Sequence, residues 1–431
     1  MIVDIATIFL LGLVIGIVVG LIPGVSIWTS VIFMLPFLHI LDYWDLIIIW
    51  LGSRIGSQYF GSVAAFLLKV PGENSTLVFF NDIDQFTSSQ RIWLIKATAV
   101  GSFVATLLGF AIIAVLYKMS YDFFVSISSN YVMAVLFAVL VLLITLMTKH
   151  KNISALLFAV GFLLAEKTDD TIPQLVYNIQ YYTSDITPFS LMLGLLIIPE
   201  IFFNKHYTQH RIDIAQVKIP LKLTHYWSIF KGSVVGLFTG LIPGQAATTS
   251  AILAYNLEKS TADKKIIASE SADNSAVITG MLPLFLLGIP MSLDAILLVN
   301  LLDIQLVEVP TDFFKSRFYG LNTFELVVVL GLIYSVLFFI LSQKFLSFYA
   351  LIFNVLFNKS SLMYGLITVW IIWVDHQTHA IGIAYFGFLI LISMAGIYIR
   401  KQNITPIPLL FGFLLGDQMY WSYRFIFSTH L

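Results

Sequence analysis

The most constraining feature of this sequence is a succession of apolar stretches along almost the whole chain. Most of them are long enough to form a membrane-spanning helix or half of one. A helix needs about 20 mostly apolar residues to cross the hydrocarbon core of a bilayer, where it satisfies its own backbone hydrogen bonds. Asp, Glu, Lys and Arg make up 11% of the 431 residues, against about 25% in soluble domains. So little charge cannot cover a water-exposed surface, so we expect an all-α polytopic membrane protein.

Several expected spans are too short to cross a membrane alone, which indicates half-helices or re-entrant segments. In the first half the expected spans are Ile5–Leu21, Val25–Ile40, Leu46–Val70, Ala97–Tyr117, Tyr131–Met147, Ile153–Leu164 and Pro188–Phe203. A polar stretch, Asn204–Tyr226, then forms a surface linker. In the second half the expected spans are Trp227–Leu241, Ala246–Leu257, Asn274–Ile289, Leu293–Leu302, Phe324–Leu341, Phe345–Phe357, Leu362–Val374, Ile381–Ile399 and Pro406–Tyr423.

Charge and cysteine content exclude further classes of protein. The 23 Lys and Arg residues nearly balance 24 Asp and Glu residues, so the chain has no basic footprint for nucleic acid. It has no cysteine, which excludes disulfide scaffolds, thiolate metal sites and cysteine nucleophiles. No Lys or Arg precedes the first apolar run, so we expect no cleavable signal peptide.

An internal repeat runs through the sequence. The stretch from Gly16 to Gly24, which ends in Leu-Ile-Pro-Gly, recurs in the second half from Gly236 to Gly244. Gly61 and the stretch from Phe66 to Pro71 recur, at almost the same offset, as Gly280 and the stretch from Phe285 to Pro290. Ile186–Gly194 likewise recurs as Ile404–Gly412. We therefore interpret residues 1–204 as a first transmembrane repeat, 205–227 as a polar linker and 228–431 as a second repeat.

The two repeats are expected to have opposite orientations in the membrane. Seven expected spans separate Pro23 from Pro243, and an odd number of spans inverts the second repeat. Lys and Arg gather in cytoplasmic loops, and most of those between residues 91 and 265 fall on one side of this topology, although Arg400 and Lys401 fall on the other. We predict inverted repeats with the N-terminus outside.

Pro-Gly pairs and a further proline interrupt the apolar stretches at matching places in both repeats. Proline removes a backbone donor, and glycine accepts backbone angles that other residues refuse. Broken helices in corresponding positions of two halves mark the binding site in many transporters, and their exposed N–H groups can hold an anion. We expect substrate to bind at and after the breaks, at Pro23, Gly24, Ser26, Thr29, Ser30, Pro71, Gly72, Glu73, Asn74, Ser75, Pro243, Gly244, Gln245, Thr248, Thr249, Asn274, Pro290 and Ser292.

Small residues and carboxylates near the breaks have alternative interpretations. The pairs Gly16/Gly20 and Gly236/Gly240 are more typical of close helix packing than of a site. Four carboxylates could bind the coupling ion, Na⁺ or H⁺, or could instead cap helices near the interface: Glu73, Glu270, Asp273 and Asp294. Lys69 could attract an anion or extend to the interface. We expect no other cofactor and no metal site.

These motifs resemble the TctA family, the large membrane subunit of the tripartite tricarboxylate transporters. The resemblance covers nearly the whole chain, and its specific pieces are Gly20–Gly24, the stretch from Tyr59 to Glu73, Gly240–Lys259, Ala268–Ser275 and Gly288–Pro290. This sequence departs from the family at three places. It has Ser269–Asn274 in place of Pro-Glu-Ala-Ala-Asn-Asn, Met291 in place of Gly, and Lys69 in place of a small polar residue.

The resemblance implies a secondary transporter of a prokaryotic cytoplasmic (inner) membrane that imports carboxylates such as citrate with an ion gradient. It also implies two partners, a periplasmic substrate-binding protein and a small membrane subunit. We therefore expect a non-enzymatic, multi-pass importer of a small organic anion of the di- or tricarboxylate class, embedded in the lipid bilayer.

Two other classes of function stay open. A membrane-embedded enzyme that acts on a lipid-linked substrate needs a chemical cluster, and we find no His-Glu-x-x-His, no nucleophile elbow and no phosphate-binding P-loop. The stretch from Asp375 to His379 contains two histidines, but it reads more readily as a hydrated turn. A passive channel or scaffold would have no need of two equivalent polar breaks.

Overall fold

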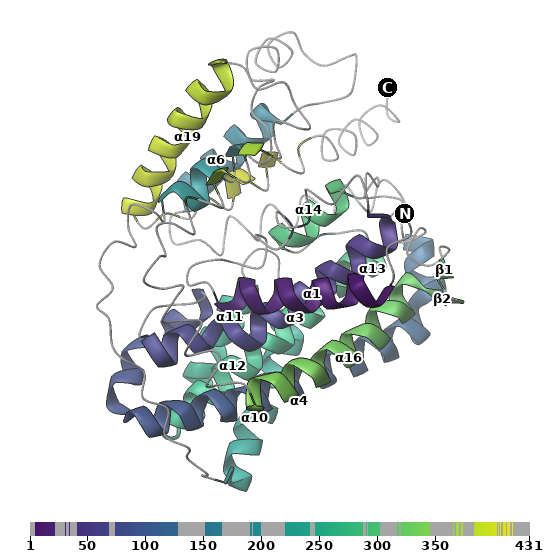
Figure 1. Ribbon diagram of the computed structural model, residues 1–431, viewed down its shortest axis with the longest axis vertical. Helices are drawn as coiled ribbons and strands as arrows, with labels where there is room; N and C mark the ends of the chain where they lie inside the picture. Colours follow the sequence, from purple (N-terminus) through teal and green to yellow (C-terminus); the bar gives the residue numbers. More distant parts are fainter. Residues whose placement is uncertain are drawn as a thin grey trace. The chain divides into compact units, whose positions relative to one another are not determined.

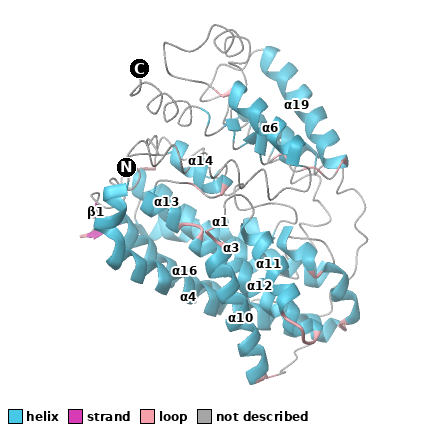
Figure 2. Cartoon of the chain, turned by 180° about the vertical axis from the view of Figure 1, so that it is seen from behind, coloured by secondary structure: helices cyan, strands magenta, loops and turns pink. Residues whose placement is uncertain are grey.

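The computed structural model is almost wholly helical in the part of the chain that it describes (Figures 1 and 2), which confirms the expected all-α class. It describes residues 5–21, 31, 34, 41–68, 74–127, 151–165, 190–191, 193–199, 220–241, 246–287, 290, 292–301, 317–318, 320–344, 365, 368–369, 372–373, 383–402, 404, 406, 408–410, 412–413 and 416. The strands β1 and β2 form a two-residue antiparallel pair, Arg317–Phe318 with Leu321–Asn322, around Gly320, which has a φ of 84°.

The helices of the first half are α1 (Ile5–Leu21), α3 (Tyr43–Leu68), α4 (Ser88–Ile127) and α6 (Lys151–Leu164). Two short 3₁₀ segments, η2 (Asn74–Val78) and η3 (Phe80–Gln85), and a π-helical turn, η4 (Leu193–Ile197), accompany them. The helices of the second half are α10 (Leu223–Thr239), α11 (Ala246–Leu257), α12 (Ala262–Thr279), α13 (Leu282–Leu287), α14 (Leu293–Leu301), α16 (Thr323–Lys344) and α19 (Ile383–Lys401).

The chain divides into two compact units, and each unit draws on both halves of the sequence. The first unit comprises Met1–Val125, Thr208–Ile304 and Glu308–Asn358. The second comprises Ser126–Tyr207, Gln305–Val307 and Lys359–Leu431. The offset of the sequence repeat moves the first-half part of each unit roughly onto its second-half part. These units do not follow the predicted repeat boundaries at residues 204 and 228 and do not test them, so that division stays a prediction.

Equivalent helix pairs occur in the first unit. Helix α1 packs along α3, and α10 packs along α12. The offset that relates Gly16 to Gly236 moves the bounds of α1 onto His225 and Leu241, each two residues beyond the corresponding bound of α10. Corresponding helices therefore pair in the same way within each half of the sequence.

Close glycine packing holds both pairs together. A Cβ atom added to Gly16 would lie 2.6 Å from the backbone oxygen of Gly52 on α3. A Cβ atom added to Gly236 would lie 2.1 Å from the backbone oxygen of Ala272 on α12. No side chain fits at these distances, so the helix-packing interpretation of the glycine motifs is confirmed.

A helix from the opposite half of the sequence covers each pair. On α16, Tyr334 lies against α3, where a Cβ atom added to Gly52 would lie 2.5 Å from its ring. On α4, a Cβ atom added to Gly109 would lie 2.7 Å from the side chain of Ile278 on α12. The two halves are thus interleaved within one unit.

Contacts in the second unit cross between the halves in the same manner. A Cβ atom added to Gly412 would lie 2.2 Å from the backbone oxygen of Phe158 on α6. Its equivalent in the sequence repeat is Gly194, whose backbone oxygen would lie 2.4 Å from a Cβ atom added to Gly396 on α19. A second-half segment therefore packs on a first-half helix, and the equivalent first-half segment packs on a second-half helix.

Two described helical stretches are long and apolar enough to cross a membrane, Ser88–Val115 within α4 and Thr323–Gln343 within α16. The helices α1 and α6 are apolar but shorter. The expected spans Val25–Ile40 (apart from residues 31 and 34), Tyr131–Met147 and Phe345–Phe357 lie outside the described residues, as do most of Leu362–Val374 and Pro406–Tyr423.

One expected span, Asn274–Ile289, is wrong in its bounds. Helix α12 already begins at Ala262 and ends at Thr279, and α13 then begins at Leu282. Its residues from Ile266 to Thr279 are all buried although many are polar, because they pack against α10 and α11. Helix α10 similarly begins at Leu223, inside the expected polar linker.

Candidate functional site

The helices end at the predicted interruptions. Helix α1 ends at Leu21, before Pro23, and α3 ends at Leu68, before Pro71. In the second half α10 ends at Thr239, before Pro243, and α13 ends at Leu287, before Pro290. New helical segments begin soon after three of the breaks, as η2, α11 and α14.

About half of the predicted site residues lie outside the described residues. These are Pro23, Gly24, Ser26, Thr29, Ser30, Pro71, Gly72, Glu73, Pro243, Gly244 and Gln245, and also Lys69 and the stretch from Asp375 to His379. The structure describes Asn74, Ser75, Thr248, Thr249, Glu270, Asp273, Asn274, Pro290, Ser292 and Asp294. Thr248 and Thr249 lie half-buried on the first turn of α11.

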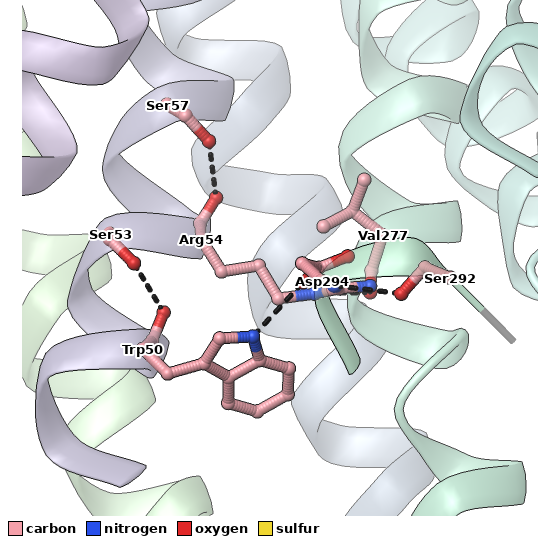
Figure 3. Close-up of polar contacts among 7 residues, drawn as sticks. All are labelled: Trp50, Ser53, Arg54, Ser57, Val277, Ser292 and Asp294. Atoms are coloured by element: carbon pink, nitrogen blue, oxygen red, sulfur yellow. Dashed lines mark hydrogen bonds and ion pairs between the residues drawn. The ribbon is translucent and has the colours of Figure 1, made fainter. Parts of the chain in front are cut away.

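A buried ion pair joins α3 to the segment that follows Pro290 (Figure 3). The Arg54 guanidinium, 3% exposed, pairs with the Asp294 carboxylate on α14. Its Nη1 also donates to Ser292 Oγ at 3.1 Å, and its Nη2 donates to the backbone oxygen of Val277 at 2.9 Å. The Trp50 indole donates to Asp294 Oδ2 at 3.0 Å. Both charges are therefore compensated within the protein.

The partners of Arg54 are groups that need a donor or a positive charge. Val277 lies in the last turn of α12, where backbone oxygens lack partners within the helix. Asp294 lies in the first turn of α14, where the helix dipole favours a negative charge. One arginine thus fixes α3 of the first half against the end of one second-half helix and the start of another.

A second buried contact joins α12 to the segment that follows Pro71. Ser75, at the start of η2, donates from Oγ to Asp273 Oδ2 at 2.8 Å. Ser62 on α3 hydrogen-bonds the Glu270 side chain. Glu270, Asp273 and Asn274 are spaced i, i+3 and i+4, so they share one face of α12.

Three side-chain oxygens on this face lack a hydrogen-bond partner in the described part of the chain: Glu270 Oε1, Asp273 Oδ1 and Asn274 Oδ1. The three residues are 2%, 2% and 1% exposed. The amide nitrogen of Asn274 donates to the backbone oxygen of Glu270 at 2.8 Å, which leaves its oxygen free. A buried polar atom without a partner is costly, so these three oxygens are candidates to bind a water, an ion or a substrate group.

The two buried contacts are related by the internal repeat. At the offset that relates Gly61 to Gly280, Arg54 corresponds to Asp273, and Ser75 corresponds to Asp294. In each contact a residue on α3 or α12 meets a residue just after the second proline break of the other half. The structure therefore brings together the predicted residues Ser75, Glu270, Asp273 and Asn274 in one group, and Ser292 with Asp294 in the other.

Sequence reasoning missed Arg54, Trp50 and Ser62, which lie inside the expected span Leu46–Val70. Aromatic residues of such spans are ordinarily lipid-facing or interfacial, yet Trp50 is fully buried. A signal for Arg54 was present, because an arginine inside an apolar span is costly in lipid and implies a buried partner.

A separate polar cluster lies where α11 ends, at Glu258 in the loop before α12. Glu258 pairs with Lys231 on α10 and accepts hydrogen bonds from Ser228 at 3.0 Å and Ser260 at 2.6 Å. Burial raises the pKa of this carboxyl, but the hydrogen bonds from Lys231, Ser260 and Ser228 outweigh burial and lower the pKa to about 2. These contacts hold α10, α11 and the start of α12 together.

A match to a known family decides the class of protein. Residues 7–411 match the family described as "Tripartite tricarboxylate transporter TctA family". The chain belongs to this family. The TctA resemblance noted from the motifs is thereby confirmed, and the chain is a membrane component of a tripartite tricarboxylate transporter. Because TctA is a family of transporters, the expectation that the chain is not an enzyme is also confirmed.

A curated relative supports the TctA assignment over nearly the whole chain. It is 24% identical over 435 residues, which cover 94% of this chain and 83% of the relative. It is called an uncharacterized 52.8 kDa protein in the TAR-I ttuC' 3' region of Agrobacterium vitis. No solved structure gives a significant match.

Proposed function

We propose that this TctA-family chain is the permease that imports a small organic anion of the di- or tricarboxylate class, driven by an ion gradient. Substrate binds at the broken helices, at Pro23, Gly24, Ser26, Thr29, Ser30, Pro71, Gly72, Glu73, Asn74, Ser75, Pro243, Gly244, Gln245, Thr248, Thr249, Asn274, Pro290 and Ser292. The coupling ion, Na⁺ or H⁺, binds among Glu73, Glu270, Asp273 and Asp294.

The observation that carries this proposal is that residues just after a break in one half contact a helix of the other half. Ser75 follows the break at Pro71 and meets Asp273 of the other half, and Asp294 follows Pro290 and meets Arg54. Polar groups from both halves thus converge in the buried interior of one unit. A passive scaffold does not require such matched, buried polar contacts.

The anion itself is held by backbone rather than by free cations. Backbone N–H groups at Pro-Gly breaks and the positive ends of the following helices attract negative charge without a lysine or arginine. Among the described residues of these contacts, the positive charge of Arg54 is already neutralised by Asp294. A substrate carboxylate therefore needs the exposed backbone.

The wider arrangement follows from the duplication. We propose inverted repeats, with the N-terminus outside, in a multi-pass protein of the prokaryotic cytoplasmic (inner) membrane. A periplasmic substrate-binding protein delivers the anion, and a small membrane subunit accompanies the permease. The crossed contacts of equivalent segments support a duplicated bundle.

The test is uptake into sealed vesicles that contain the purified chain with its two partners. An imposed sodium or proton gradient is expected to drive uphill accumulation of at least one compound from a panel of di- and tricarboxylates. Gly72→Leu and Gly244→Leu are expected to abolish accumulation, because a large side chain occupies the backbone approach. Gly387→Leu is the matched control, since a Cβ atom at Gly387 on α19 meets nothing within 4 Å. Normal uptake by both site variants would contradict the proposed site.

A further inference from the structure

The two crossed contacts differ in charge although the repeat relates them. On one side the protein supplies both members of an ion pair, the Arg54 guanidinium and the Asp294 carboxylate. On the other side the position equivalent to Arg54 is itself an acid, Asp273, and the position equivalent to Asp294 is the hydroxyl of Ser75. The first contact is neutral overall, whereas the second is negative.

Glu270 adds a further negative charge to the second contact. It lies one helical turn before Asp273 on the same face of α12, and Asn274 presents its free oxygen on that face. Two carboxylates and one amide oxygen, all at least nine-tenths buried, thus share one face of α12 from which water is largely excluded.

The described residues give these carboxylates hydroxyl partners and no cation. Their contacts are the hydrogen bonds from Ser75 and Ser62. Taking two charges of one sign out of water without a counter-charge is strongly unfavourable. The three partnerless oxygens are the hard ligands that alkali and alkaline-earth cations prefer.

We propose that Glu270, Asp273 and Asn274 bind one exchangeable monovalent cation of the sodium type, and that the Arg54 guanidinium fills the equivalent position of the other half permanently. The proposal rests on the proposed function, because an exchangeable cation here is the one that couples to substrate. It removes Asp294 from the four carboxylates proposed to bind the coupling ion, because Asp294 neutralises Arg54 instead.

The ligand set favours a monovalent over a divalent cation. Ca²⁺ takes six to eight oxygen ligands, and Mg²⁺ keeps several waters in a strict octahedron. Three side-chain oxygens on one packed helix face are too few for the first, and residues that are 1–2% exposed cannot give the second its several waters. Nowhere in the described residues do three or more His, Asp or Glu side chains gather as around a metal ion.

Thermal unfolding of the full chain in detergent tests the site independently of transport. Sodium chloride, replacing choline chloride at constant ionic strength, is expected to raise the unfolding midpoint saturably by at least about 3 °C. Asp273→Asn and Glu270→Gln are expected to lose this rise. Both amides keep the side-chain volume and remove an uncompensated charge, so both variants should fold at least as well as the parent without sodium.

Asp263→Asn is the matched control, because Asp263 lies in the first turn of the same helix and contacts His225 instead. It is expected to retain the full sodium-dependent rise. Equal midpoints in sodium and choline for the parent chain would overturn the proposal. A sodium-dependent rise that persists in both Asp273→Asn and Glu270→Gln would also overturn it.

Arg54→Gln tests the second half of the proposal. Removal of the guanidinium leaves Asp294 without compensation, so sodium should raise the midpoint of this variant by more than it raises that of the parent. An unchanged sodium effect would show that the Arg54 position is not equivalent to a cation site. If carboxylate uptake runs on a proton gradient while sodium has no effect on unfolding, the cation site fails and the permease function stands.

Discussion

The pair α1–α3 and the pair α10–α12 show what a duplicated sequence keeps and what it changes. In both pairs glycines bring one helix onto the backbone of the other, as Gly16 does on Gly52 and Gly236 does on Ala272. The charged residues of the second helix differ completely, with Arg54 in one pair and Asp273 in the other. Backbone approach has a single steric solution, whereas a buried polar contact can be made by residues of different charge.

The second helix of each pair also differs in continuity. Helix α3 runs unbroken to Leu68, through Ala64. The position equivalent to Ala64 is Pro283, and the chain there breaks into α12 and α13. Proline removes a donor and clashes with the preceding turn but is tolerated in the first turn of a helix. The break frees the backbone oxygen of Val277, which Arg54 of the unbroken helix then binds.

The largest effect is expected from breaking the glycine packing that the two pairs share. Gly236→Val and Gly16→Val should each destabilise the protein by about 3 kcal/mol or more, because overpacking against a backbone cannot be relieved by a side-chain rotation. Gly236→Val should be the worse, since its Cβ atom would meet a backbone oxygen at 2.1 Å rather than 2.6 Å. Thermal unfolding in detergent measures both, with Gly387→Val as the control in open space. Equal stability of all three variants would show that the close approach does not matter.

An effect of similar size is expected from the charges that distinguish the pairs. Arg54→Met leaves Asp294 buried without its partner and should cost about 3–5 kcal/mol. The double variant Arg54→Met, Asp294→Leu removes both charges and should recover most of that loss. Chemical or thermal unfolding of the two variants and the parent gives the comparison. A double variant no more stable than Arg54→Met would mean that the bonds of Arg54 to Val277 and Ser292, rather than the ion pair, account for the loss.

The sequence predicted helices best where proline limits an apolar run. The bounds expected for Ile5–Leu21 and Ala246–Leu257 are those of α1 and α11, because a Pro-Gly pair stops the first helix and precedes the second. The packing role of the glycine motifs was also predictable, since small residues at i and i+4 allow close helix approach.

The buried polar residues of α12 could not be found by hydropathy. Apolar stretches indicate contact with lipid, but the face that contains Glu270 and Asp273 is buried against other helices. The stretch before Asn274 therefore lies outside the expected spans, although α12 is buried from Ile266 to Thr279. Arg54 was overlooked for the converse reason, because its span looked like uniform lipid-facing filler. Contacts between residues in different halves of the chain cannot be derived from the local pattern on either side.

The smallest effect is expected from a contact that the described residues show in one helix pair only. Glu258 joins α10 to the end of α11, and its pKa is lowered to about 2 from an ordinary value of 4.5. A lowered pKa in the folded state means that the carboxylate form stabilises the fold above about pH 4.5, and that this contribution is lost as the pH falls towards 2. Glu258→Gln should therefore lower the unfolding midpoint by about 2 °C at pH 7, and the difference from the parent should close on acidification below pH 4.5. Lys231→Met, which removes the partner charge, should show the same pH dependence. A midpoint difference that stays constant from pH 7 to pH 3 would show that Glu258 acts through packing alone, and the pair α10–α12 would then rest on the same steric principle as α1–α3.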